Sequence, residues 1–177
     1  MQAEAVDRVR LVFTLFDADG NGAIESDDFE LMADRVVAAV PEADAAKRTA
    51  MAGALRRFWT TLVTELDADG DGNISFEEFR AIVLSPERFA GAVDEFAQAL
   101  TAVTDLDGDG LVERPTFVAV MRAIGFALPN INALFDALEP VGTDQASVPA
   151  WAEAIREYYR PDAAGTAGDL LVGTPAG

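Results

Sequence analysis

Cysteine and histidine are both absent from this 177-residue chain. Their absence excludes disulfides, zinc sites built from Cys and His, thiolate nucleophiles and the commonest general base. Long apolar runs are missing too, since none approaches the roughly 20 residues that span a bilayer. The amino terminus carries acidic residues where a signal peptide would be basic. We therefore expect a cytoplasmic protein that is not inserted in a membrane and is not an enzyme.

Positive charge is scarce, because 31 acidic residues outnumber 13 basic ones and the formal net charge is −18. A surface with this charge repels phosphates, which makes nucleic acids and anionic membranes poor partners. An acidic surplus of this size indicates either a solubilising surface or bound cations, depending on whether the acids are spread or clustered. Hydrophobic residues make up 50% of the chain, which is enough for one sizeable core.

The acids are clustered in three twelve-residue segments that align when the sequence is compared with itself. These segments read DADGNGAIESDD from Asp17, DADGDGNISFEE from Asp67 and DLDGDGLVERPT from Asp105. An apolar segment with helical periodicity precedes each one, and an aromatic residue follows it directly. The flanks of a fourth copy surround EPVGTDQASVPA, which starts at Glu139 and has lost most of the acids. The pattern predicts an all-α protein of four helix-loop-helix units in two pairs that form one compact body, with a degenerate fourth loop.

Helix boundaries divide the chain into two pairs of units and a tail. The boundary signals are Pro41, Ser85 with Pro86, Gly125 with Pro129, and Pro161. We expect residues 1–84 to form the first pair, residues 85–160 the second pair, and residues 161–177 a carboxyl-terminal tail. The segment 43–66 is long for one entering helix, so the first pair should be spaced more widely than the second.

Each acidic segment follows the oxygen pattern of an EF-hand calcium loop, with ligands at positions 1, 3, 5, 7 and 12 and glycine at position 6. Position 7 contributes its backbone carbonyl, and an aliphatic residue at position 8 predicts a short β-bridge between Ile24 and Ile74. The candidate ligands are Asp17, Asp19, Asn21, Ala23 and Asp28 in the first loop, Asp67, Asp69, Asp71, Asn73 and Glu78 in the second, and Asp105, Asp107, Asp109, Leu111 and Glu113 in the third.

The loops differ at position 12, where a glutamate binds calcium through both oxygens. Only the second loop has that glutamate; the alternative, a solvated acidic turn, has no need of one. Asp28 is one methylene shorter, so we expect weaker calcium binding there and better tolerance of Mg²⁺. Thr116 in the third loop cannot replace a carboxylate, although Glu113 at position 9 could coordinate directly and compensate. Ala150 and Asp144 break the fourth loop. We predict about three Ca²⁺ per chain, with Mg²⁺ as an alternative ion at the first loop.

The loop motifs, the wide spacing of the first pair and the short apolar tail resemble calerythrin and the sarcoplasmic calcium-binding proteins. This resemblance covers nearly the whole chain. It implies two EF-hand pairs in one compact body, one or more inactive loops and a role in calcium buffering. Light-emitting photoproteins share the architecture, but their chemistry relies on histidine, which this chain lacks.

Two functions stay open from the sequence, a calcium buffer or transporter and a calcium sensor that regulates a helical protein partner. A sensor exposes a methionine-rich groove when calcium binds, whereas this chain has four methionines. The tail carries Leu170, Leu171 and Val172, which could fold back and fill such a groove; the alternative is a disordered terminus. We therefore expect a monomeric buffer. The aromatic residues could line an organic ligand pocket, but their helical spacing is more typical of core: Trp59, Trp151, Tyr158 and Tyr159.

Overall fold

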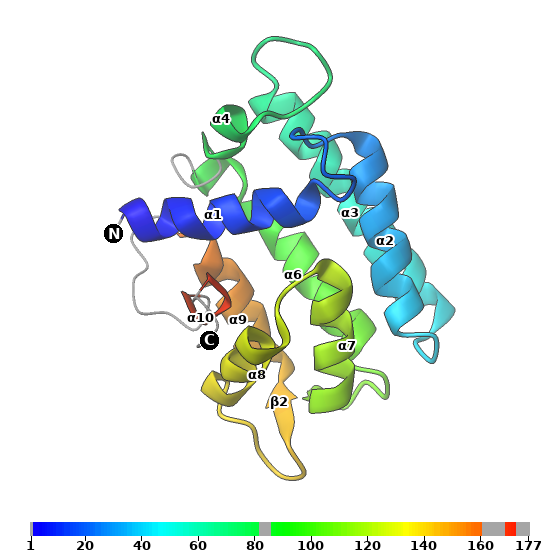
Figure 1. The fold of residues 1–177 in the computed structure, drawn as a ribbon. Helices are drawn as coiled ribbons and strands as arrows, with labels where there is room; N and C mark the ends of the chain where they lie inside the picture. The colour runs from blue at the N-terminus through cyan, green and yellow to red at the C-terminus, as the bar shows by residue number, and fades with distance from the viewer. Residues whose placement is uncertain (1, 82–85, 161–168, 173–177) are drawn as a thin grey trace.

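Helices joined by short loops make up most of the chain in a computed structural model, which describes residues 2–81, 86–160 and 169–172 (Figure 1). The elements are α1 (Gln2–Phe16), α2 (Ser26–Ala39), α3 (Ala45–Leu66), α4 (Phe76–Phe79), the 3-10 helix η1 (Pro86–Arg88), α6 (Ala90–Thr104), β1 (Leu111–Glu113), α7 (Arg114–Ile124), α8 (Leu128–Ala137), β2 (Gln145–Ser147), α9 (Val148–Tyr158) and α10 (Asp169–Val172). The predicted all-α class is confirmed, with one small sheet between two of the loops.

Proline and glycine set several of the helix ends, as the sequence indicates. A proline stands in the first turn of α7, α8 and α9, where its missing N–H costs no hydrogen bond. Helix α7 ends at Gly125, whose φ of +119° favours glycine. One boundary differs from expectation: Ser85 lies outside the described residues, and Pro86 opens a 3-10 turn instead of the long helix. The buried Phe89 follows that turn, and α6 begins only at Ala90.

The two pairs of helix-loop-helix units pack against each other side by side. Helix α3 lies along α6, and α2 lies against α7. The ring of Phe58 from α3 stacks on that of Phe96 from α6, with centroids 5.8 Å apart, so one apolar core runs through both pairs. The first and second loops lie at the upper end in Figure 1, and the third and fourth lie at the lower end.

Short β contacts join the loops within each pair. Ile24 and Ile74 form the predicted bridge, in which each amide donates to the other carbonyl at 2.9 Å. In the second pair, β1 and β2 run antiparallel over three residues, with Val112 opposite Ala146. Both contacts are buried, so each pair of loops is tied to the core beneath it.

The carboxyl-terminal helix α10 packs against α8 and α1. Leu171 is buried and belongs to the core cluster, whereas Leu170 is 39% exposed. Val172 completes the helix. Among the described residues, no helix is both long enough and apolar enough to cross a bilayer.

Candidate metal centres

Three groups of carboxylates converge in the loops that the sequence singles out. Within each group, one oxygen from each residue lies within 4.8 Å of the others. The groups are Asp17, Asp19 and Asp28; Asp67, Asp69 and Asp71; and Asp105, Asp107 and Asp109. Among the described residues no such group falls in the fourth loop. Hard oxygen donors at this spacing suit Ca²⁺, and Mg²⁺ after it.

Each loop is shaped by its first aspartate, whose carboxylate accepts backbone amides from the other side of the turn. The glycine at position 6 provides one of these amides, and it has the positive φ that the turn requires: +92°, +81° and +85° along the chain. The amide of Gly22 donates to Asp17 at 2.8 Å, that of Gly72 to Asp67 at 2.9 Å, and that of Gly110 to Asp105 at 3.0 Å. These hydrogen bonds therefore turn the carboxylates of each loop towards one another.

The second loop is closed by Glu78, which is the third residue of α4. Its Oε1 accepts the amide of Ala68 at 3.0 Å, and its Oε2 accepts the amide of Ser75 at 2.9 Å. The latter belongs to a capping box that starts α4. The amide of Ser75 also lowers the pKa of Glu78 below its ordinary value, so this carboxylate is held ionised beside the aspartates.

The first loop uses the shorter Asp28 at the same place, the third residue of α2. Asp28 is 2% exposed, and burial raises its pKa. Its oxygens accept the amides of Glu25 at 2.8 Å and Asp19 at 3.2 Å, again with a capping box. An oxygen of Asp28 lies in the group with Asp17 and Asp19. The first loop is therefore a tighter, more enclosed version of the second.

The third loop lacks this closing carboxylate. Thr116 is the third residue of α7, and no side chain caps that helix. Glu113 accepts a hydrogen bond at 3.1 Å from Nε2 of Gln145, in the opposite strand. Glu113 is thus placed at the joint between the third and fourth loops, and its coordination of a metal stays a prediction.

Two cations make long-range contacts that the sequence did not predict. Lys47 of α3 donates its ammonium to the carbonyl of Asp105 at 2.6 Å, so the first pair caps the end of α6 where the third loop begins. Arg8 of α1 is fully buried and contacts the tail. A signal was present for Arg8, because it stands four residues before Val12 on the apolar face of α1.

An apolar cavity of about 60 Å³ lies between α1, α6, α9 and α10. Its lining includes Phe96, Trp151, Tyr158 and Leu171. Organic ligand pockets measure about 300–1,000 Å³, so this cavity is too small for one. Trp151 is 1% exposed, which supports the interpretation of the aromatic residues as core.

Helix pairs that hold carboxylate loops of this geometry define a class of calcium-binding proteins. A sequence model of the EF hand matches residues 9–33 and 64–84. A calcium-binding protein from Streptomyces coelicolor is 30% identical, with a TM-score of 0.74 over 88% of this chain and 98% of that protein. The chain therefore belongs to the EF-hand family of calcium-binding proteins.

Two further solved structures share the fold. The sarcoplasmic calcium-binding protein from amphioxus has a TM-score of 0.72 at 20% identity and covers 97% of both chains. Mg²⁺-loaded apo-berovin, a ctenophore photoprotein, has a TM-score of 0.65 at 20% identity and covers 86% of both. The likeness to sarcoplasmic proteins predicted from the sequence is confirmed for the fold.

Proposed function

We propose that this protein is a cytoplasmic calcium buffer that works as a monomer. The observation that carries the proposal is the position of α10, which packs its Leu171 into the apolar core between α1 and α8. A sensor needs a groove that a partner helix can enter. Here a segment of the chain itself fills that place.

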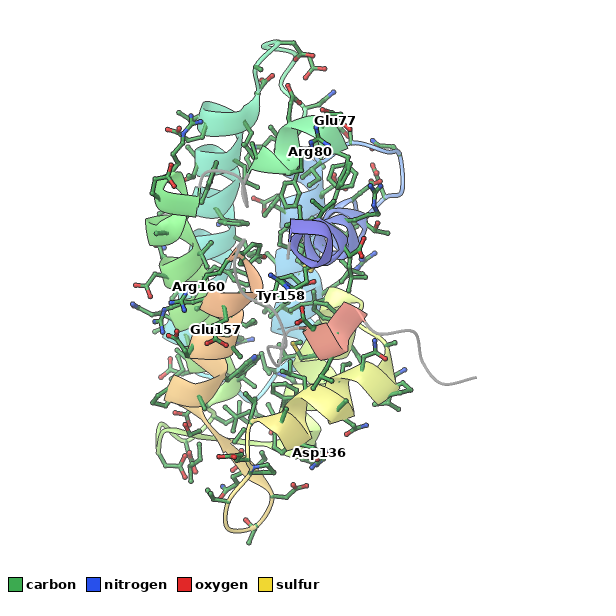
Figure 2. All side chains as sticks on the ribbon, turned by 90° about the vertical axis from the view of Figure 1, so that its left-hand side faces the viewer. Glu77, Arg80, Asp136, Glu157, Tyr158 and Arg160 are labelled. Carbon is green, nitrogen blue, oxygen red and sulfur yellow. The ribbon has the colours of Figure 1, made fainter. Side chains whose placement is uncertain are left out.

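The tail is held by polar contacts as well as by Leu171. Nη1 of Arg8 lies 2.5 Å from Oδ1 of Asp169, and the same guanidinium donates to the carbonyls of Tyr158 and Arg160, each at 2.8 Å. The carbonyl of Leu171 accepts a hydrogen bond from Asn130 at 2.9 Å. Figure 2 shows Tyr158 between α9 and α1, beside α10. These contacts satisfy a buried cation, and their loss would leave it unpaired, so release of the tail is costly.

The three acidic loops would bind about three Ca²⁺, through the side-chain and carbonyl oxygens predicted above. Those loops contain 14 of the 31 acidic residues, and three divalent ions would change the formal charge from −18 to −12. Mg²⁺ is the competing ion at the first loop, where Asp28 is shorter than glutamate. All three calcium-binding loops of berovin bind Mg²⁺, which supports this ion choice within the same fold. We propose residues 1–84 and 85–160 as the two functional pairs and 161–177 as the tail that closes them.

A calcium titration followed by calorimetry and a hydrophobic dye tests the proposal. We expect three ions per chain and no rise in dye fluorescence, because the apolar face stays covered. Removing the residues after Pro161 should raise dye fluorescence in the calcium-loaded state. Asp169→Asn should raise it less, since Leu171 remains. Asp7→Asn, which removes an exposed carboxylate from α1, is the matched control that should change nothing.

The second candidate is a calcium sensor with a helical protein partner. It is favoured by the Streptomyces coelicolor protein, whose structure is described as a basis for prokaryotic calcium-mediated regulation. A sensor would brighten the dye strongly when calcium is added to the full-length chain, and truncation of the tail would add nothing. That result would overturn the buffer proposal.

A further inference from the structure

Arg114, the first residue of α7, reaches across to the fourth loop and binds it with almost every donor it has. Nε and Nη2 contact the two carboxylate oxygens of Asp144 at 2.6 and 3.0 Å. Nη2 also donates to Asp136 at 2.6 Å, and Nη1 donates to the amide oxygen of Asn132 at 3.1 Å. The guanidinium lies 4.3 Å from the ring centroid of Phe135. Figure 2 shows Asp136 on α8, at the end of the molecule where these loops meet.

The fourth loop keeps a positive φ at position 6 although it has lost most of the acids and forms a bridge of its own between Val141 and Gln145. Asp144 stands at position 6, where the other loops have glycine, and it adopts a φ of +70°. A non-glycine residue in this region is strained, and the strain persists only when its surroundings hold it. The bidentate contact from Arg114 stabilises Asp144 in this conformation. The backbone amide of Arg114 also donates to the carbonyl of Asp144 at 3.3 Å.

A guanidinium between two carboxylates supplies what the metal supplies elsewhere, a positive charge with several oxygens around it. Asp136 comes from the helix that enters the loop, and Asp144 comes from the loop, so the guanidinium ties the loop to its entering helix. Arginine stays charged at all relevant pH values, and its planar fork matches a carboxylate with two parallel hydrogen bonds. The pKa of Asp144 is held below its ordinary value by the hydrogen bond from Arg114.

We propose that Arg114 takes over the stabilising role that a metal ion has in such loops and so holds the fourth loop, the β-pairing partner of the third, in place without calcium. The inference about the third loop rests on the proposed function, because it assumes that this loop binds calcium. Arg114 directly follows β1, whose Glu113 accepts a hydrogen bond from Gln145 of β2. At the other end of the ladder the amide of Val148 donates to the carbonyl of Gly110 at 2.9 Å. Arg114 is thus a positioning residue: it prearranges a loop that lacks the closing carboxylate at Thr116.

Amide hydrogen exchange in the calcium-free protein tests whether Arg114 stabilises the fourth loop. Arg114→Gln should speed exchange of the Val148 amide by about tenfold or more, because two charge-assisted hydrogen bonds to the fourth loop are lost. The amides of Ile24 and Ile74 in the first pair should keep their rates. Arg114→Lys should restore part of the protection, since it keeps the charge but not the fork. Arg122→Gln, an exposed arginine on the same helix, is the matched control and should change nothing.

An unchanged Val148 rate in Arg114→Gln overturns the proposal, and so does an equal loss of protection in both pairs, which would show a general loss of stability. Asp144→Asn provides the second variant should Arg114→Gln fail to fold. It keeps the cation and weakens only the contact with the loop, and it should give the same local loss.

Calcium titration by NMR tests the effect on the third loop. The amides of Gly22, Gly72 and Gly110 each donate to the first aspartate of their own loop, so each reports one site. In Arg114→Gln the midpoint for Gly110 should move to roughly tenfold higher calcium, with the other two unchanged. An unchanged Gly110 midpoint overturns the positioning role. If Gly110 does not respond in the unaltered protein, the proposed third site is wrong, and the exchange experiment still decides the role of Arg114 in the fourth loop.

Discussion

The two loops of the first pair are linked differently from the two loops of the second pair. In the first pair both loops have converging carboxylates, and a single bridge between Ile24 and Ile74 links them among the described residues. In the second pair one loop has lost most of the acids, and a three-residue ladder links it to its neighbour. Arg114 adds two side-chain hydrogen bonds to Asp144 of that loop and two more to α8. The fourth loop is therefore held by hydrogen bonds from a positively charged residue of its own chain.

This difference predicts where the metal-free protein is weakest. The first and second loops each contain five acidic residues within twelve positions, and among the described residues the one ion pair that these acids make is that of Glu77 with Arg80. Empty carboxylate groups repel one another, and the repulsion is relieved only when ions bind. The first pair should therefore depend on calcium for its stability, and the second pair should depend on it much less.

The largest expected effect is that of removing calcium altogether. Each site should contribute about 2.7 kcal/mol to folding when free calcium exceeds its dissociation constant a hundredfold. The two tryptophans separate the pairs, because Trp59 lies 5.7 Å from Phe29 in the first and Trp151 lies 4.7 Å from Phe117 in the second. With Trp151→Phe and Trp59→Phe variants, chelation should shift the emission of Trp59 more than that of Trp151. Equal emission shifts for the two tryptophans would contradict the prediction that the first pair depends more on calcium than the second.

A smaller effect is expected from Glu78→Gln, which strips the closing carboxylate from the second loop. The calcium affinity of that site should fall by roughly a hundredfold, within the range that ligand charge produces in such loops. Calorimetry should lose one strong site. Glu139→Gln in the fourth loop removes the same charge where no carboxylate group converges, and its titration should match the unaltered protein. Loss of a site in that control would mean that the fourth loop binds metal.

The substitution Thr116→Glu should give the third loop the closing carboxylate that the second loop has. The new carboxylate would occupy the third residue of α7, as Glu78 occupies the third residue of α4. We expect about tenfold tighter calcium binding at the third loop, seen as a lower midpoint for the Gly110 amide. Thr116→Gln is the control, since it adds length without charge and should give no such gain.

The smallest effect should come from Asp28→Glu within the first pair. A longer side chain lets both oxygens reach the ion, so calcium affinity should rise by a few-fold and competition from millimolar Mg²⁺ should weaken. Calcium titrations with and without Mg²⁺ measure both. An unchanged competition profile would show that the length of the side chain does not decide the ion, and the enclosure of Asp28, which is 2% exposed, would then be the cause.

The position of the loops and the convergence of their carboxylates could be predicted from the sequence, because the whole pattern lies within twelve consecutive residues. The helix ends at Gly125 and Pro129 followed from the same kind of local rule. The bridge between Ile24 and Ile74 joins residues that are far apart in the sequence. It was predictable only because both loops have an aliphatic residue at position 8, where paired loops of this motif meet.

What tertiary structure alone decided are the contacts between distant charges. Arg8 meets Asp169 across 161 residues, and Arg114 meets Asp144 across 30. No local spacing predicts these pairs, because they depend on which helix faces pack together. The same packing turned Glu113 towards Gln145, held Asp144 at a positive φ and left a cavity too small for an organic ligand. The sequence by itself determined where carboxylates cluster and which loop lacks most of them; the packing of helices decided how Arg114 meets that loop and which segment covers the core.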